Sequence, residues 1–432
     1  MQQIVWPSKQ GKPGRWPLRE ESMNYLKSLV AAAALATCSI GVSSADTVKI
    51  GYIDPLSGHF ALAGDTGLKH FRYAADRINE AGGAGGMTVE IVPFDNKVNP
   101  KESLVQLQKA IDQGIRYIVQ GNGSSVASAL IDAINKHNKR NPGEEVLFLN
   151  YAAVDPAFTN DRCSFWHFRF DADADMKMAA MTDWLAKQDD IKKVYILGQD
   201  YSFGKAVANA AVTMIAEKRP DIEIVGNELH PLGKVKDFTP YIQKMIASDA
   251  DAVITGNWGQ DMTLLVKAAS SAGHDVPYLT YYGGGLGAVA TMGEGAIGLV
   301  KQITEFHQNI ETSEEQVANM DRFQERYGTD YYYQRVFTLM EMFDKAVDEV
   351  GENDPVKVAF ALAGMEHETP YGPVSMREDN HQLIQPLFIS TFSDDVSRKL
   401  EGTAFGFITD PDGKIDGDAT RTATTCQMKR PG

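Results

Sequence analysis

The sequence predicts an α/β protein made of two doubly wound parallel-sheet lobes. From Val48 onward, short β-branched runs alternate with amphipathic segments, which is the pattern of a parallel sheet with helices on both faces. The same alternation starts again after residues 165–170, so a second lobe of the same class is expected. The chain of 432 residues, with 43% hydrophobic and 23% charged residues, is long enough for two domains with ordinary cores.

The first lobe is predicted from strands at residues 48–53, 88–94, 117–120 and 146–150, with helices between them. In the segment 65–81, Leu68, Phe71, Ala75 and Ile78 recur at helical spacing, and two glycines follow as a stop signal. Asn99 and Pro100 are typical of the cap and first position of a second helix. A third helix is expected to begin near Ser124.

The second lobe is predicted from helices at 176–187, 203–218, 238–247 and 261–272 and strands at 194–198, 222–225, 252–255 and 277–281. A long amphipathic helix at about 332–350 has no strand next to it in the sequence, so we expect it to return to the first lobe. The segment between them, 298–326, is mixed in character.

Residues 1–45 are predicted to be a leader whose signal peptide spans 23–45. Lys27 precedes an apolar run at 29–40, and small residues end it at Ala45. The run is shorter than the roughly 18–20 apolar residues needed to span a bilayer. We therefore expect export to the periplasm, with either Met1 or Met23 as the start. A lipoprotein signal ending at Cys38 is the alternative.

The charge balance excludes several partners. Loss of the five Lys and Arg and the two Asp and Glu in residues 1–45 changes the net charge from −15 to −18. Such acidity argues against nucleic acid or anionic lipid as a partner. Cys163 and Cys426 would then be the remaining cysteines, either as a disulfide in an oxidising compartment or as two free thiols.

The loop from Gly121 to Ser125 follows a strand and opens a helix, so its backbone N–H groups and two hydroxyls can bind an anion such as a carboxylate. The alternative is that both serines only cap the helix. Val126 occupies the place of the third glycine of a dinucleotide fingerprint, and no phosphate-binding loop occurs. We expect no cofactor.

The motifs of common enzymes are missing. The sequence contains no G-x-S-x-G, H-E-x-x-H or paired C-x-x-C, and the nine histidines are scattered. Two groups of aspartates, at 171–175 and 410–418, lack the spacing of a calcium loop, so a helix cap and a turn are expected there and no metal site. Aromatic residues fall at several loop positions, where they can either line a cleft or pack in the core.

Taken in order, several segments resemble the type I periplasmic binding proteins of branched-chain amino-acid (leucine/isoleucine/valine) ABC importers. They are Ile53 to Gly58, Gly64-Asp65, Ile78 to Gly83, Gly121 to Ser125, Asp155 to Thr159, Phe168-Arg169, Tyr201 to Gly204 and the loop near Trp258. The resemblance covers essentially the whole mature length. It implies the periplasmic binding protein-like I fold, with three chain crossings forming a hinge between the lobes.

The resemblance also implies a ligand site. It assigns the ligand carboxylate to Ser125, with Ser124 one position away, and to the backbone of Ala152, Ala153 and Val154. Phe60, Phe203, Trp258 and Tyr282 are the further candidate ligand-binding residues. On the side that would bind the ligand ammonium, two positions depart from the family. Val154 replaces a hydroxyl residue and Tyr282 replaces an acidic one, so both partners of a ligand ammonium are missing.

The predicted function is capture of a small amino acid, or a related organic acid or amide, and its delivery to an ABC permease without catalysis. We place the hinge near residues 169–171, 303–306 and 372–376, so that the first lobe comprises 46–168 and 304–373 and the second 169–303 and 374–432. The alternatives are the ligand-sensing module of a receptor and a secreted α/β hydrolase.

Overall fold

The structure is a computed structural model that describes residues 46–285 and 287–431. The leader predicted over residues 1–45, with Cys38, therefore lies outside the described residues. Ala45–Gly432 forms one compact unit. Among the described residues, no helix has both the length and the apolar character needed to cross a membrane.

The first lobe is built on a five-stranded parallel sheet with the strand order β2-β1-β3-β4-β5. Its strands are β1 (Thr47–Asp54), β2 (Thr88–Asp95), β3 (Tyr117–Gln120), β4 (Leu147–Asn150) and β5 (His167–Arg169). The helices between them are α1 (Ala61–Glu80), α2 (Pro100–Asp112) and α3 (Ser124–Arg140), followed by the 3₁₀ turn η1 (Pro156–Thr159). The chain adds β2 on one side of β1 and β3 to β5 on the other, so the winding reverses between β1 and β3. A doubly wound sheet binds its ligand at such a point.

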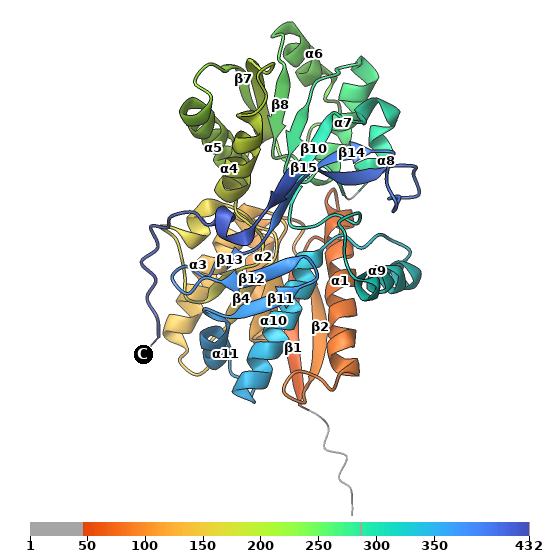
Figure 1. The fold of residues 1–432 in the computed structure, drawn as a ribbon. Coiled ribbons are helices and arrows are strands. Elements are labelled where there is room, and N and C mark those ends of the chain that lie inside the picture. The colour runs from red at the N-terminus through yellow and green to blue at the C-terminus, as the bar shows by residue number, and fades with distance from the viewer. Residues whose placement is uncertain (1–45, 286, 432) are drawn as a thin grey trace, which may run out of the picture. The chain divides into compact units, whose positions relative to one another are not determined.

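Helices from a distant part of the chain complete this lobe. They are α9 (Glu314–Tyr327), α10 (Gln334–Val350) and α11 (Pro355–Leu362). Phe71 on α1 and Phe337 on α10 belong to one core, while Leu107 on α2 and Leu130 on α3 belong to another on the opposite face of the sheet (Figure 1). The predicted return of the long helix to the first lobe is thus confirmed.

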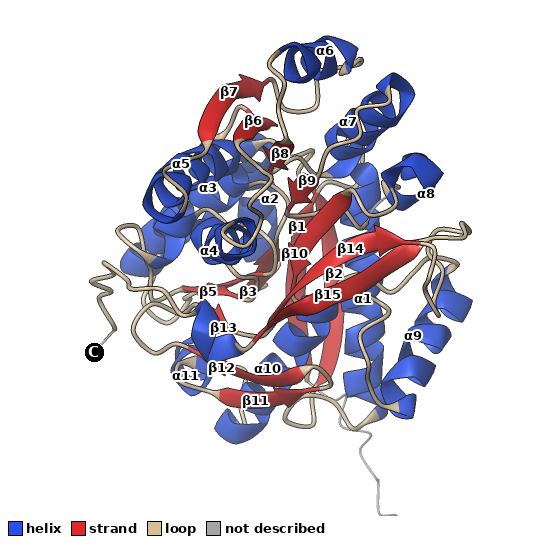
Figure 2. Cartoon of the chain, turned by 45° about the horizontal axis from the view of Figure 1, so that its top comes forward, coloured by secondary structure: helices blue, strands red, loops and turns tan. Residues whose placement is uncertain are grey.

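The second lobe contains a seven-stranded sheet with the order β15-β14-β10-β9-β8-β6-β7 (Figure 2). Its parallel strands are β6 (Lys193–Gln199), β7 (Glu223–His230), β8 (Ala252–Thr255), β9 (Tyr278–Thr280) and β10 (Val300–Thr304). Its helices are α4 (Ala174–Leu185), α5 (Ser202–Lys218), α6 (Thr239–Ala247), α7 (Gly259–Ala272) and α8 (Val289–Met292), with the 3₁₀ turn η2 (Glu294–Ala296). Within this sheet, the order β7-β6-β8-β9-β10 repeats the order β2-β1-β3-β4-β5 of the first sheet.

The C-terminal quarter adds antiparallel strands that the sequence analysis did not predict. Strands β14 (Leu387–Ser393) and β15 (Gly406–Ile415) extend the second sheet beyond β10, and the 3₁₀ turn η3 (Gly417–Thr420) follows. Strands β11 (Glu366–Thr369), β12 (Gly372–Met376) and β13 (Leu383–Ile384) form a separate antiparallel sheet. Val374 and Leu383 of this small sheet belong to the core around α10.

The chain passes between the two sheets three times. It leaves β5 for α4 after Arg169, leaves β10 for α9 after Thr304, and leaves β13 for β14 after Ile384. From the sequence, the first two crossings are expected near residues 169–171 and 303–306. The third comes after the expected 372–376 because that segment, β12, pairs within the small sheet before the chain crosses.

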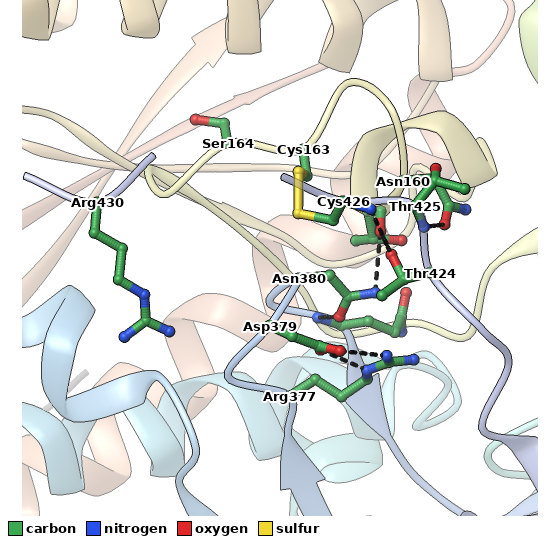
Figure 3. The surroundings of a disulfide bond; sticks show 12 residues. Asn160, Cys163, Ser164, Arg377, Asp379, Asn380, Thr424, Thr425, Cys426 and Arg430 are labelled. Atoms are coloured by element: carbon green, nitrogen blue, oxygen red, sulfur yellow. Dashed lines mark hydrogen bonds and ion pairs between the residues drawn. A yellow bond between two sulfur atoms is a disulfide. The ribbon is translucent and has the colours of Figure 1, made fainter. Parts of the chain in front are cut away.

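Cys163 and Cys426 form a disulfide that joins the C-terminal tail to the loop before β5 (Figure 3). Hydrogen bonds hold the same tail against the first lobe. The Thr424 hydroxyl donates to the carbonyl of Thr159, and the Asn160 side chain accepts from the backbone N–H of Thr425. Because β15 belongs to the second sheet, the tail carries the chain from the second lobe back to the first, where the disulfide anchors it.

We predict that replacing both cysteines by serine lowers the free energy of unfolding by about 2–5 kcal/mol, because the disulfide closes a long loop in the unfolded chain. The two cysteines are 263 residues apart in sequence. Urea unfolding of the oxidised protein and of the double variant measures the change. Equal stability, or free thiols by mass spectrometry under non-reducing conditions, would contradict the prediction.

Candidate functional site

A narrow pocket lies between the lobes, at the carboxyl ends of the parallel strands of both sheets. The loops after β3 and β4 contribute Gly121, Asn122, Gly123, Ser124, Ala152 and Val154; the second lobe contributes Tyr201, Phe203, Trp258 and Tyr282; and the segment before α10 contributes Tyr332 and Tyr333. The cavity measures about 30 Å³. One water needs about 10–15 Å³ by this measure, so little free space remains in this conformation.

Helix N-termini from both lobes meet at this pocket, since α7 and α10 also begin after lining residues, Trp258 and Tyr333. Helix α3 begins after Gly123 and helix α5 after Tyr201, and both of these residues line the cavity. Neither helix has a side-chain cap or an acidic residue in its first turn. The first N–H groups of a helix have no partner within the helix and carry the positive end of its dipole. The ends of α3 and α5 therefore favour negative charge in the pocket.

A buried carboxylate holds the loop before α3 in place. Asp54, at the end of β1, accepts hydrogen bonds from the backbone N–H groups of Gly121 (3.1 Å) and Asn122 (3.0 Å) and from the hydroxyl of Tyr151 (2.7 Å). A Cβ at residue 121 would lie 2.7 Å from the Tyr151 ring, so only glycine fits there. Because these two N–H groups are bound to Asp54, the N–H groups nearer the start of α3 are the ones left for a ligand.

Aromatic rings form most of the remaining wall. The Trp258 indole N–H donates to the Tyr201 hydroxyl at 2.8 Å, which joins two of the rings that line the pocket. Phe60, from the first lobe, stacks on Trp258 with ring centroids 4.3 Å apart. A second contact between the lobes lies beside this stack, since His59 Nε2 is 3.3 Å from Asp261 Oδ1. The lobes are thus closed over the pocket on this side.

Six of the nine ligand-binding residues proposed from the sequence line the pocket: Ser124, Ala152, Val154, Phe203, Trp258 and Tyr282. The other three lie beside it. Phe60 stacks on Trp258, and Ser125 follows Ser124 on α3 without lining the cavity. The backbone N–H of Ala153 donates to the Asn150 side chain at 2.7 Å, so this group is already used within the first lobe.

A cluster of buried charges lies behind Tyr282, where the chain crosses between the lobes. Asp171 pairs with Lys177 at 2.7 Å and also with Arg335, and Arg335 Nε lies 2.9 Å from Glu305. The Tyr282 hydroxyl donates to Asp171 at 3.1 Å. All four charged side chains are at most 5% exposed. Two acids and two bases balance here, so the cluster offers no free charge to the pocket.

Sequence reasoning missed Tyr332 and Tyr333 as site residues. The run Tyr331-Tyr332-Tyr333 immediately precedes α10, whereas the sequence predicts a helix from about residue 332. The structure places these residues in the non-helical segment before it, where they reach the pocket. Three consecutive tyrosines next to a helix start were the available signal. Among the described residues, no group of three or more His, Cys, Asp or Glu is placed to hold a metal ion.

The Asp54 carboxyl gives a testable pH dependence. Burial raises its pKa to about 6, although the hydrogen bonds from Tyr151, Asn122 and Gly121 oppose this shift. A raised folded-state pKa contributes stability that is present below the unfolded pKa of about 4 and is lost as the pH rises through about 6. We predict that the free energy of unfolding of the wild type, measured relative to that of Asp54→Asn, falls by on the order of 3 kcal/mol between pH 4 and pH 7.

Urea unfolding at several pH values measures this difference, and the comparison with Asp54→Asn isolates Asp54 from other titrating groups. Parallel curves for the two proteins would show that Asp54 does not titrate in this range.

Comparison with known proteins agrees with this geometry. Residues 47–396 match the model of the periplasmic binding protein family. The chain is 32% identical over 418 residues to the Leu/Ile/Val-binding protein homolog 4 of Brucella abortus, an alignment that covers 94% of this chain and 99% of the relative.

Solved structures show the same fold. The closed conformation of the leucine-, isoleucine-, valine-, threonine- and alanine-binding protein of Brucella ovis superposes with a TM-score of 0.79 at 32% identity, covering 90% of this chain and all of that one. A solute-binding protein of Rhodopseudomonas palustris, solved with 3,4-dihydroxybenzoic acid, gives a TM-score of 0.73 at 20% identity, covering 86% and 98%. The predicted two-lobed fold and solute-binding role are confirmed. The chain belongs to the periplasmic binding protein family, the solute-binding components of ABC importers.

Proposed function

We propose that this solute-binding protein captures a small carboxylate that has an aromatic or apolar body and no ammonium group. The observation that carries the proposal is the pairing of two uncapped helix N-termini, α3 and α5, with a pocket lining that contains no charged side chain among its described residues. The helix ends favour an anion. Nothing in the lining balances a cation.

The carboxylate is expected at the start of α3. Ser124 lines the cavity, and its hydroxyl and the first-turn N–H groups of α3 are donors at that end of the pocket. Asp54 fixes this loop by binding the N–H groups of Gly121 and Asn122. An anion held by such preorganised donors loses little on leaving water, because the donors replace its hydration.

An ammonium group would lack an ionic partner. By the family resemblance, Val154 and Tyr282 occupy the two positions that supply that partner, and the buried acid next to Tyr282, Asp171, already binds Lys177, Arg335 and the Tyr282 hydroxyl. Leaving a buried charge unpaired costs about 3–5 kcal/mol. A ligand without the ammonium avoids this cost.

The body of the ligand is expected to be flat and apolar. Six rings line the pocket, from Tyr201, Phe203, Trp258, Tyr282, Tyr332 and Tyr333. Aromatic side chains bind a flat ring by stacking and edge contacts. The relative from Rhodopseudomonas palustris, crystallised with 3,4-dihydroxybenzoic acid, indicates that this fold accommodates such a ligand.

A branched-chain amino acid is the second candidate. The 32% identical relatives carry leucine, isoleucine and valine in their names, which favours this candidate. Its ammonium would have to bind backbone carbonyls or the hydroxyls of Tyr282, Tyr332 or Tyr333. The two candidates differ in the ammonium and in the shape of the apolar body, so binding measurements separate them directly.

We infer that closure of the lobes buries the ligand and forms the surface presented to the permease, and that the chain works in the periplasm. The stack of Phe60 on Trp258 and the pair of His59 with Asp261 join the lobes in the closed state. We also infer that the site binds without turnover. Its lining offers serine, asparagine and tyrosine groups but no acid or imidazole to act as a general base.

We predict that the purified protein, freed of ligand by unfolding and refolding, binds benzoate, and that Ser124→Ala weakens this binding about 10–100-fold. A hydrogen bond to a charged group contributes about 1.5–3 kcal/mol. Ser125→Ala is the matched control, because it removes the same hydroxyl from the next residue, outside the cavity lining. Isothermal titration calorimetry measures all three proteins.

Two results would count against this proposal. If only leucine-like amino acids bind, the ligand class is wrong. If Ser125→Ala weakens binding and Ser124→Ala does not, the carboxylate binds at the position that the family resemblance indicated.

A further inference from the structure

A second, larger cavity lies on the other side of one pocket residue. It measures about 380 Å³, and its lining includes Thr66 on α1, Gly285 after β9, Gln308, Asp330 and Glu401. Tyr332 belongs to the linings of both this outer cavity and the inner pocket. The Tyr332 side chain therefore lies between a space of about 30 Å³ and one more than ten times larger.

The second lobe holds the Tyr332 ring from one side. A Cβ at residue 285 would lie 2.1 Å from Tyr332 Cε2 and 2.4 Å from Cζ, so the ring rests directly on the backbone of Gly285. Gly285 follows β9 of the second sheet, while Tyr332 precedes α10 of the first lobe. Glycine at 285 permits this close approach between the lobes, and a side chain there would displace the ring.

The first lobe holds the segment that carries Tyr332 through hydrogen bonds to its backbone. His70 on α1 is fully buried, and its Nε2 accepts hydrogen bonds from the backbone N–H groups of Tyr332 (2.9 Å) and Tyr333 (3.2 Å). Its Nδ1 lies 2.7 Å from the carbonyl oxygen of Thr66, so Nδ1 carries the proton and donates it there. Burial lowers the pKa of His70 to about 3, which keeps the imidazole neutral and both acceptor bonds intact.

A neighbouring residue joins this segment to the second lobe. Asp330 accepts a hydrogen bond from the backbone N–H of Glu401 at 2.6 Å. The Glu401 carboxylate in turn accepts from the N–H groups of Gly287 (2.6 Å) and Ala290 (2.7 Å). The segment that carries Tyr332 is thus fixed to both lobes in the closed state.

We propose that Tyr332 determines the length of ligand that the protein accepts, by closing the inner pocket against the outer cavity, and that His70 is the positioning residue that holds it there. This inference rests on the proposed carboxylate-binding function. A carboxylate bound at α3 with a tail longer than one ring would have to displace Tyr332. Since Asp330 and Glu401 line the outer cavity, a neutral tail fits there better than an anionic one.

The test compares benzoate with 4-butoxybenzoate, which adds a neutral tail, by isothermal titration calorimetry. We expect the wild type to bind benzoate more tightly, and Tyr332→Ala to improve the affinity for 4-butoxybenzoate relative to benzoate by at least about tenfold, because the tail then buries its methylene groups in the outer cavity. Tyr332→Phe keeps the ring without the hydroxyl and should retain the wild-type preference.

Two variants of His70 test its positioning role. In His70→Gln the side-chain oxygen reaches the place of Nε2 and can still accept from the two N–H groups, whereas in His70→Asn the shorter side chain cannot. We expect His70→Gln to keep the wild-type ligand preference and His70→Asn to shift it toward that of Tyr332→Ala. Thermal unfolding of every variant checks that each remains folded. A general loss of stability alone would not make the ligand preference of His70→Gln differ from that of His70→Asn.

The outcomes separate this inference from the proposed function. If the wild type binds benzoate but the preference is the same in folded Tyr332→Ala, or if the wild type binds both ligands equally, Tyr332 does not set ligand length and the inference is overturned. Equal preferences in His70→Gln and His70→Asn would overturn the role of His70. If the wild type binds no carboxylate lacking an ammonium, the proposed function fails, and the inference fails with it.

Discussion

The buried ion cluster of Asp171, Lys177, Glu305 and Arg335 is the interaction on which the closed arrangement of the lobes depends. Asp171 lies in the first crossing and Glu305 in the second, while Lys177 belongs to α4 of the second lobe and Arg335 to α10 of the first. Taking away one member would leave a buried charge without its partner, at a cost of about 3–5 kcal/mol. The cluster therefore links both crossings to helices of the two lobes, and the pocket lies where the lobes meet.

This constraint also explains the character of the pocket. Because the acids near the site are committed to charged partners or backbone N–H groups, the electrostatic preference left to the cavity is that of the helix ends. Asp54 illustrates the principle, since it binds the N–H groups of Gly121 and Asn122 and so directs the remaining donors of α3 toward the cavity. Tyr282 fits the same arrangement, since its hydroxyl donates to Asp171.

Much of the fold could be predicted from the sequence because each strand and helix of the two parallel windings has a local pattern. The predicted strand at 252–255 coincides with β8, and the helix at 203–218 begins one residue after α5 does. The strands from Glu366 onward could not be predicted in this way. Strand β15 pairs with β14 through a ladder interrupted by an irregularity, and its apolar residues do not alternate regularly.

The candidate site was predictable where loops follow strands directly, as for Ser124, Trp258 and Tyr282. The sequence could not reveal that Asn150 uses the N–H of Ala153, or that Tyr332 reaches the pocket from a segment more than 200 residues away from Ser124. Both depend on tertiary contacts. The role of His70 likewise becomes visible only when its two nitrogens are placed against Thr66, Tyr332 and Tyr333.

The most direct test of the account is isothermal titration calorimetry of the ligand-free protein with phenylacetate and phenylglycine. These two molecules share a carboxylate and an aromatic ring and differ in the ammonium group. The account predicts that phenylacetate binds and that phenylglycine binds at least about 100-fold more weakly, in line with the cost of an unpaired buried charge. Equal or tighter binding of phenylglycine would contradict it and would show that the protein supplies a partner for the ammonium.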